Sequence, residues 1–331
     1  MYVIIGLLMF LLLILIHELG HFTAAKLSGI KVNEFSVGMG PNIKNWKKGE
    51  TKYSLRALPI GGYVAMEGEE EDSEDERSYN NAKPIKRFIT ILAGPMMNLL
   101  LAFIIFTGIF MVTGIMSNTV GEVMDASAAQ SAGLKKGDEI VSIDGKKMTD
   151  FDSVSKAIKA SEGRSMDIKF VRDGQEMSVK VAADKTDAGY LLGVSPMAKK
   201  DFARSITAGF DQVINIIVLL WTTLVQLVTG GLGLENLSGP VGVIKEVGTA
   251  ASYGVATLFS FIAIISVNLG FFNLLPIPAL DGSKLLFITL EMIFGRPINR
   301  KFEQTVTIVG FLLLLSLIVV VSVKDVYSII K

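Results

Sequence analysis

The first 26 residues constrain the fold of this chain more than any other segment. An unbroken apolar run, VIIGLLMFLLLILI, occupies residues 3–16, and apolar residues resume after position 21. A helix needs about 20 mainly apolar residues to cross a bilayer, so residues 1–26 are predicted to form the first transmembrane helix. The motif HELGH stands inside it, at positions 17–21. Ionisable side chains within a membrane helix are costly and usually mark function.

The spacing of the polar side chains in this motif predicts a metal site. His17 and His21 are four residues apart, so in a helix their imidazoles project from one face and can bind the same ion. Glu18 projects beside His17 and can reach a water on that ion without being a ligand, as in zinc peptidases with a Glu general base. The chain contains no other histidine. The alternative is a chance motif or a polar cluster that serves only helix packing.

Composition places the whole chain among polytopic membrane proteins. Of its 331 residues 50% are hydrophobic, and the mean hydropathy is +0.49; both values are typical of several membrane spans. The 32 Lys and Arg balance the 32 Asp and Glu, so no net charge points to a nucleic-acid partner. The absence of cysteine excludes disulfides, a thiolate metal site and a cysteine nucleophile. The N-terminus lacks the basic region and the cleavage site of a signal peptide.

Residues 27–88 are predicted to form a cytoplasmic, membrane-associated β region with an acidic linker. Lys and Arg are frequent there, and the positive-inside rule places such loops in the cytoplasm. Residues 52–58 alternate polar and apolar, as a half-buried strand does, and an earlier strand is predicted to open at residues 35–37. The open edge of this sheet could pair with an extended peptide, although a purely structural hairpin is an equal alternative. The acidic run 67–76 is interpreted as a solvated linker.

Residues 89–116 are predicted to form the second transmembrane helix. The sequence GPMMN lies near its start, at 94–98. Its Gly-Pro pair permits close helix contact and a local break. Asn98 needs a hydrogen-bond partner in an apolar helix, and two interpretations stay open. It either holds helices together or has a role near the metal site.

Residues 117–200 have the composition of a soluble domain, and they are expected outside the cell because one membrane crossing separates them from the cytoplasmic loop. Small residues end in AGL at 132–134, and a Gly-Asp turn follows at 137–138. With a strand that closes at 144–145, this order resembles a PDZ domain, which binds peptides by strand addition beside an apolar groove. The resemblance implies that residues 151–160 form its groove helix and residues 171–175 a hairpin turn. The alternative is a domain of similar pattern without a ligand.

The third metal ligand is predicted to be Asp281. A catalytic zinc needs three protein ligands and an open position, and a chain with no third histidine and no cysteine must supply a carboxylate. Two prolines break the helix before Asp281, and Gly282 lets the chain turn toward the metal. Because His17 lies near the cytoplasmic end of its helix, Asp281 must reach that side. If the apolar segment 206–228 crossed the membrane, the next apolar run, 255–275, would run outward and carry Asp281 to the opposite side. The segment 206–228 is therefore predicted to be amphipathic or partly inserted rather than spanning.

This reasoning divides the rest of the chain into four segments. They are an amphipathic helix with the loop SGPVG at 201–252, a third transmembrane helix ending in LDG at 253–282, a cytoplasmic loop at 283–303 and a fourth transmembrane helix at 304–327. Both termini are then expected outside the cell.

The chain resembles the site-2 protease family, in its bacterial single-PDZ branch. The resemblance rests on five features in chain order, namely HELGH, GPMMN, the PDZ-like domain, SGPVG and NLLPIPALDG. Members are intramembrane zinc metalloproteases that cut transmembrane segments of other proteins, often anti-sigma factors or remnant signal peptides. The resemblance implies Zn²⁺ as cofactor and the bacterial plasma membrane as location. The roles that it implies are metal ligands for His17, His21 and Asp281, catalytic base for Glu18, substrate binding for Asn273, and substrate reception by the strands around 32–66.

We therefore expect a polytopic α-helical membrane protein with about four transmembrane helices, a small membrane-associated β-sheet and an inserted α+β PDZ-like domain. Its expected partners are transmembrane protein substrates, the lipid bilayer and a peptide or protein ligand of the PDZ-like domain, but no nucleic acid. The main alternative is a catalytically inactive scaffold, which has no reason to retain Glu18. A prenyl-protein type membrane protease would not explain the PDZ-like domain, and a metal transporter would need further intramembrane ligands.

Overall fold

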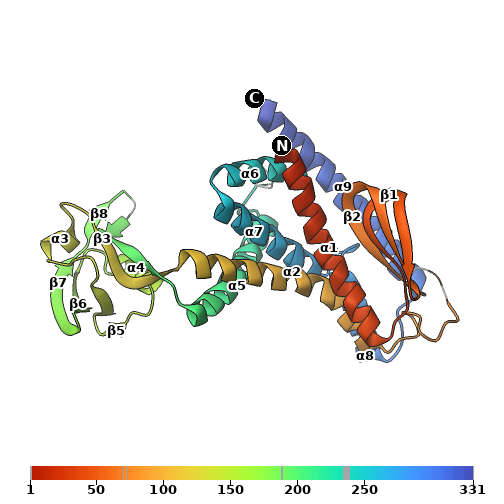
Figure 1. The fold of residues 1–331 in the computed structure, drawn as a ribbon, viewed down its shortest axis with the longest axis horizontal. Coiled ribbons are helices and arrows are strands. Elements are labelled where there is room, and N and C mark those ends of the chain that lie inside the picture. The colour runs from red at the N-terminus through yellow and green to blue at the C-terminus, as the bar shows by residue number, and fades with distance from the viewer. Residues whose placement is uncertain (1, 70, 72, 188, 234–238, 331) are drawn as a thin grey trace. The chain divides into compact units, whose positions relative to one another are not determined.

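The protein consists of two compact units, shown in Figure 1. The computed structural model describes residues 2–69, 71, 73–187, 189–233 and 239–330. The first unit combines Met1–Phe106 with Gly209–Lys331, and the second is Thr107–Ala208. The second unit is therefore an insertion between the two halves of the first.

Within the described residues, five helices are long and apolar enough to cross a membrane. They are α1 (Tyr2–Ser28), α2 (Pro84–Thr113), α5 (Phe202–Val228), α7 (Val255–Leu274) and α9 (Arg300–Ile330). Four of them cover the predicted transmembrane segments. The fifth, α5, covers the segment predicted to be amphipathic or partly inserted, and length and composition alone make it a fifth candidate.

Two shorter helices follow α5 and α7. The helix α6 (Pro240–Ser252) includes most of the SGPVG sequence, of which Ser238 lies outside the described residues. The helix α8 (Asp281–Phe294) occupies most of the segment predicted as a cytoplasmic loop at 283–303. That segment is helical because one of its faces is apolar, and Leu285 and Ile288 pack into a core shared with α1, α2 and the adjacent sheet.

The predicted third transmembrane helix ends earlier than expected. α7 stops at Leu274, and a link with two prolines leads to α8, which begins at Asp281. Proline lacks the backbone N–H that a helix needs and clashes with the preceding turn, so one helix cannot continue to 282. Gly282 permits the tight packing of α8 on the end of α7, because a Cβ there would collide with the backbone carbonyls of α7 and its cap.

α2 runs antiparallel to α1. His21, in the C-terminal part of α1, bonds to Thr90 in the first turns of α2. Leu13, nearer the start of α1, packs in a cluster that includes Leu101, farther along α2. The chain direction in α2 is therefore opposite to that in α1.

α7 also runs antiparallel to α2, and hence parallel to α1. Ser266 Oγ of α7 donates to the backbone carbonyl of Asn98 in α2 at 2.8 Å. Gly270, one turn after Ser266 in α7, lies against the carbonyl of Pro95, which is one turn before Asn98 in α2. Consequently α1 and α7 both begin on the side of the helix bundle on which α2 ends.

Two long, irregular strands, β1 (Val32–Lys48) and β2 (Thr51–Met66), form the predicted small sheet beside α1. Residues 34–37 have partners on both sides, namely residues 62–65 and residues 52–55. The rest of β1 pairs with the start of β2 as a hairpin. Bends at Gly38 and Gly61, both with positive φ, separate these parts. The segment 61–66 thus pairs along one side only and forms an edge of the sheet.

The second unit is an α+β domain. Its sheet has the antiparallel order β10-β3-β4-β6-β7, and β5 pairs with β4. The strands are β3 (Ile115–Val123), β4 (Glu139–Ile143), β5 (Lys146–Lys147), β6 (Ser165–Arg172), β7 (Gln175–Ala182) and β10 (Val194–Lys199), with a separate pair β8 (Asp184–Thr186) and β9 (Gly189–Leu191). The helices α3 (Ala128–Ser131) and α4 (Phe151–Ala160) complete it. Both the helix predicted at 151–160 and the hairpin at 171–175 are present.

Candidate metal centre

The structure brings the three predicted metal ligands together. Nε2 of His17 lies 3.1 Å from Nε2 of His21, and Oδ2 of Asp281 lies 3.0 Å and 3.3 Å from these two atoms. The histidines come from successive turns of α1, and the aspartate from the first turn of α8. Within the described residues, no other group of three or more His, Cys, Asp or Glu side chains brings its ligand atoms this close.

The spacing of these atoms fits one small ion. Bonds of about 2.0–2.1 Å at tetrahedral angles place the ligand atoms of zinc about 3.3 Å apart, close to the observed distances of 3.0–3.3 Å. Two imidazole nitrogens and a carboxylate oxygen offer the donor types that zinc accepts. Asp281 Oδ2 is buried and has no hydrogen-bond partner among the described residues. A cation between the three atoms would bind this oxygen and satisfy its charge in place of a hydrogen bond.

A backbone carbonyl orients His21. Its Nδ1 lies 2.9 Å from the carbonyl oxygen of Thr90. Because a carbonyl can only accept, Nδ1 carries the proton, and the lone pair of Nε2 in the neutral ring faces the other ligands. The ring lies so close to Gly94 that a Cβ on this residue would collide with it. The glycine of the GPMMN sequence therefore provides the space for a metal ligand.

Glu18 lies next to this group and faces the small sheet. Its Cγ is 3.6 Å from the position that a Cβ would occupy on Gly62, and Gly62 belongs to the edge segment 61–66. A Cβ on Gly62 would collide with the carbonyl oxygen of Ser36 at 2.8 Å, whereas its distance to Glu18 would be an ordinary van der Waals contact. Glu18 therefore extends from α1 toward the edge of the sheet, where a proton acceptor could act on a chain bound there.

Asn273 is not part of the metal group in the structure. Its Nδ2 donates to the carbonyl oxygen of Leu269 at 2.9 Å, within the same helix. The side chain is partly buried, and its role beside a substrate stays a prediction.

Sequence reasoning missed Thr90 and the special place of Gly62. Thr90 acts through its backbone carbonyl, and no side-chain pattern reveals such a role. Gly62 is half of a Gly-Gly pair within a strand. Glycine inside a strand often marks a close approach of another group, so this signal was present in the sequence.

Arg56 ties the parts of the small sheet together. Its guanidinium donates to Glu34 Oε1, Ser36 Oγ and the carbonyl of Gly40, each at 2.9 Å, and it also contacts Tyr63. Burial alone would raise the pKa of Glu34. Hydrogen bonds with polar neighbours, Arg56 among them, outweigh burial and lower this pKa to about 2.

The acidic run 67–76, interpreted above as a solvated linker, is partly fixed by ion pairs. Lys31 pairs with Glu67 and Asp75 at 3.2 Å and 2.9 Å. Glu69 pairs at 2.7 Å with Lys284, one turn beyond Asp281 in α8. Glu70 and Asp72 lie outside the described residues.

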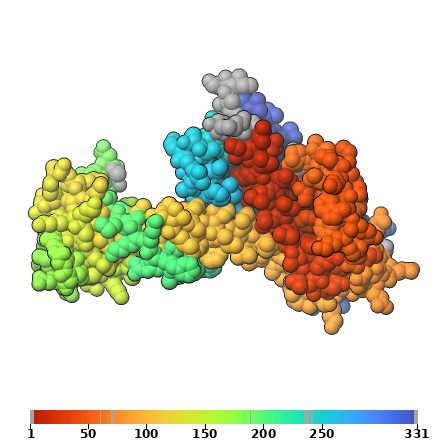
Figure 2. Space-filling model, in the orientation of Figure 1, coloured from red at the N-terminus to blue at the C-terminus, as the bar shows by residue number. Residues whose placement is uncertain are grey.

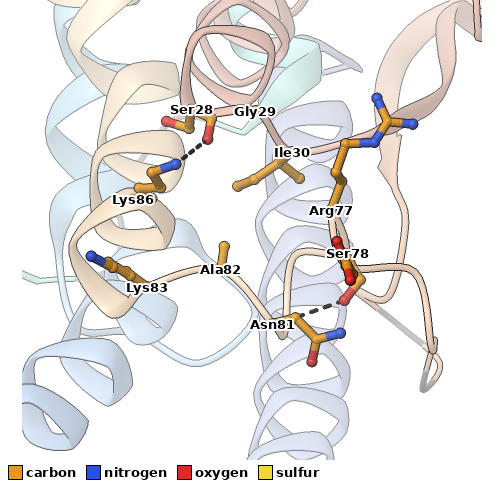
Figure 3. Close-up of a pocket in the computed structure, with 10 residues that line it drawn as sticks. Ser28, Gly29, Ile30, Arg77, Ser78, Asn81, Ala82, Lys83 and Lys86 are labelled. Atoms are coloured by element: carbon orange, nitrogen blue, oxygen red, sulfur yellow. Dashed lines mark hydrogen bonds between the residues drawn. The ribbon is translucent and has the colours of Figure 1, made fainter.

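A cavity of about 250 Å³ lies where α1 ends and α2 begins (Figure 3). It is lined by residues 28–30, 76–78, 81–83 and 86, and Lys86 donates across its rim to the carbonyl of Ser28 at 2.8 Å. None of its lining residues belongs to the metal group, so this cavity is not assigned to the predicted chemistry.

The fold and the site together define a class of protein, namely a polytopic helical membrane protein with a candidate metal centre of two histidines and one aspartate. The model of peptidase family M50 matches residues 5–317 of the chain. The chain therefore belongs to peptidase family M50, the site-2 protease family. The family predicted from the sequence motifs is confirmed.

Bacterial relatives cover almost the whole chain. A protein of Clostridium perfringens is 41% identical over 98% of both chains. A protein of Clostridium acetobutylicum is 40% identical over 98% of this chain and 97% of its own, and one of Fusobacterium nucleatum is 36% identical over 98% of both. Each carries the name "Putative zinc metalloprotease". These names agree with the predicted metal.

Proposed function

We propose that this protein is an intramembrane zinc metalloprotease that hydrolyses peptide bonds within or near transmembrane segments of other membrane proteins. The observation that carries the proposal is the meeting of His17, His21 and Asp281 within 3.0–3.3 Å of one another. Membership of a peptidase family and the names of the relatives support it.

The three grouped side chains would hold zinc and leave one coordination position open for water. Zinc in such a site supplies Lewis-acid activation of water at neutral pH. The bond from His21 to the Thr90 carbonyl fixes the ring so that Nε2 faces the centre. Outer partners of this kind preserve the orientation of a metal ligand.

Glu18 would act as the general base. It follows His17 directly and is not one of the grouped ligands, so its carboxylate is free to accept the proton of the attacking water. The same carboxylate would then return the proton to the leaving amine nitrogen. This role gives a reason for Glu18 in a membrane helix, whereas a catalytically inactive scaffold gives none.

The edge segment 61–66 would hold the substrate in extended form. A helical substrate hides its carbonyls in its own hydrogen bonds, so it must unwind before hydrolysis, and pairing with a sheet edge stabilises the unwound chain. Gly62 in this segment lies against Glu18. Figure 2 shows the sheet at the surface of the first unit. The sheet exposes the apolar side chains of Met39, Ile43, Trp46, Leu55 and Leu58. These side chains suit the sheet to an apolar partner. Asn273 would lie beside the bound chain.

The helix directions support the predicted membrane topology. α7 begins on the side on which α2 ends, so the chain between them crosses the membrane an even number of times. The helix α6, with 13 residues, is too short to span the membrane. A crossing by α5 would then be the single crossing between α2 and α7, which is an odd number, so we infer that α5 does not span. Exposed apolar residues occur along α5 at positions 202, 206, 210, 214, 218, 219, 221, 225 and 228, most of them three or four residues apart. Such a stripe suits a helix that lies in the membrane interface.

The second unit would then lie outside the cell, with the protein in the bacterial plasma membrane. Its five-strand antiparallel order and the helix α4 support a PDZ-like role, in which the domain binds a peptide or protein and controls access to the active site. The chemistry would not depend on it directly.

Cleavage of a reporter transmembrane segment by the purified full-length protein tests the proposal. We expect products cut within or near the apolar segment, identified by mass spectrometry. A chelator should abolish cleavage, and added Zn²⁺ should restore it. An intact reporter under zinc-loaded conditions, with several apolar segments tried, would favour the inactive scaffold.

A further inference from the structure

Besides Asp281 Oδ2, two buried polar groups close to the metal centre lack hydrogen-bond partners among the described residues. One is Nδ1 of His17, and the other is the side-chain amide of Asn98, of which both Oδ1 and Nδ2 are unpaired. Asn98 is only 1% exposed. Buried polar groups are nearly always paired in native proteins. Two such exceptions on neighbouring helices therefore require an explanation.

The register of α1 against α2 places these groups at the same level. The ring of His21 occupies the space in which a Cβ of Gly94 would lie. His17 is one turn before His21 in α1, and Asn98 is one turn after Gly94 in α2. Because the helices are antiparallel, both steps lead in the same direction. Asn98 therefore lies opposite His17, as Gly94 lies opposite His21. The difference is that Asn98 presents a polar side chain where Gly94 presents none.

We propose that Asn98 is a positioning residue for His17, and that its Oδ1 accepts a hydrogen bond from the Nδ1–H of His17, directly or through one water. This inference rests on the proposed zinc site. A neutral imidazole that uses Nε2 as a metal ligand carries its proton on Nδ1, which then needs an acceptor. Thr90 supplies the acceptor for His21, and Asn98 supplies the corresponding one for His17.

The backbone of Asn98 is well placed for this role. Its carbonyl oxygen accepts a hydrogen bond from Ser266 Oγ at 2.8 Å, which links this position of α2 to α7. An amide held at a three-helix contact can keep a ring in one orientation. Helix packing alone would not require an amide that has no partner.

The affinity of the purified protein for Zn²⁺, measured by competition with a chromogenic chelator, tests the proposal. We expect Asn98→Leu, which keeps the volume but loses the acceptor, to weaken zinc binding by roughly 10–100-fold. Asn98→Asp retains an acceptor oxygen and should stay within a few-fold of wild type. The matched control is Thr107→Val, since Thr107 is also buried in α2 with an unpaired hydroxyl; it should not change the affinity.

Wild-type affinity in Asn98→Leu would overturn the proposal, as would equal losses in the Leu and Asp variants or in the Thr107 control. If Asn98→Leu does not fold, as judged by gel filtration, Asn98→Ala provides the same test with a smaller side chain. Absence of zinc binding by the wild type would overturn the metal assignment itself. The two failures are therefore distinguishable without an activity measurement.

Discussion

Oδ2 of Asp281 lies 3.0 Å from Nε2 of His17, although the two residues lie far apart in the sequence. The parallel course of α1 and α7 carries both residues to the same depth, and the proline-containing link then turns the carboxylate toward the histidines. The metal centre is therefore complete only when the C-terminal helices pack on α1. Zinc binding should in turn stabilise this packing.

Removal of a ligand should remove the metal. We expect one zinc per chain in the wild type, and loss of stoichiometric zinc in His17→Ala and Asp281→Ala, since two protein ligands hold zinc weakly. Elemental analysis after gel filtration measures this directly. Asp152→Ala is the control, because the Asp152 side chain is 71% exposed. Full zinc in the Asp281 variant would mean that another group is the third ligand.

The contact between Gly94 and His21 should make this glycine intolerant of a side chain. A Cβ on Gly94 would collide with the His21 ring, so Gly94→Ala should lower both zinc occupancy and stability, the latter by about 1–3 kcal/mol as for other overpacked sites. Gly108→Ala in the same helix is the control, since a Cβ there meets no atom within 4 Å. Equal behaviour of both variants in thermal unfolding and metal analysis would contradict this explanation.

The grouping of the three candidate ligands could be predicted from the sequence because each depends on local spacing or on elimination. His17 and His21 are separated by one helical turn, and the lack of cysteine and of a third histidine left a carboxylate, for which Asp281 after the proline-broken helix is the candidate. The contacts that orient these ligands could not be predicted. Thr90 acts through its backbone, and the contact of Gly62 with Glu18 depends on how the sheet folds against α1.

Labelling of introduced cysteines should reveal the topology, because the chain has no natural cysteine. An impermeant maleimide added to intact cells should label Lys146→Cys in the second unit but not Lys48→Cys in the small sheet. Leu232→Cys, beyond α5, should also be labelled from outside. Reversed labelling of the first two would overturn the orientation. Labelling of position 232 only from inside would show that α5 crosses the membrane.

The low pKa of Glu34 predicts a pH dependence for the small sheet. Folding lowers this pKa to about 2, so the ionised carboxylate stabilises the sheet above the ordinary glutamate pKa of about 4.3. That contribution should be lost as the pH falls from about 5 toward 2. The fluorescence of Trp46, which stacks on Tyr53, can follow unfolding in a Trp221→Phe background. Glu34→Gln should flatten the profile, and an unchanged slope in this variant would refute the assignment.

The secondary structure was less predictable where tertiary packing decides it. The segment after Asp281 was expected to be a loop, yet it forms α8 because Leu285 and Ile288 find a buried core. The small sheet was predicted from polar alternation. The pairing of residues 34–37 on both sides was not predicted. A polar and apolar alternation identifies a strand but does not identify the strands that pair with it.

The most direct test of the account is the effect of Glu18→Gln on zinc content and cleavage, measured on the same preparation. Amide replacement keeps the size of the side chain but removes the proton acceptor. We expect full zinc occupancy, since Glu18 is not among the grouped ligands, and a loss of reporter cleavage of at least 10²–10⁴-fold, the usual contribution of a general base. Wild-type cleavage by the zinc-loaded Glu18→Gln protein would contradict the mechanism.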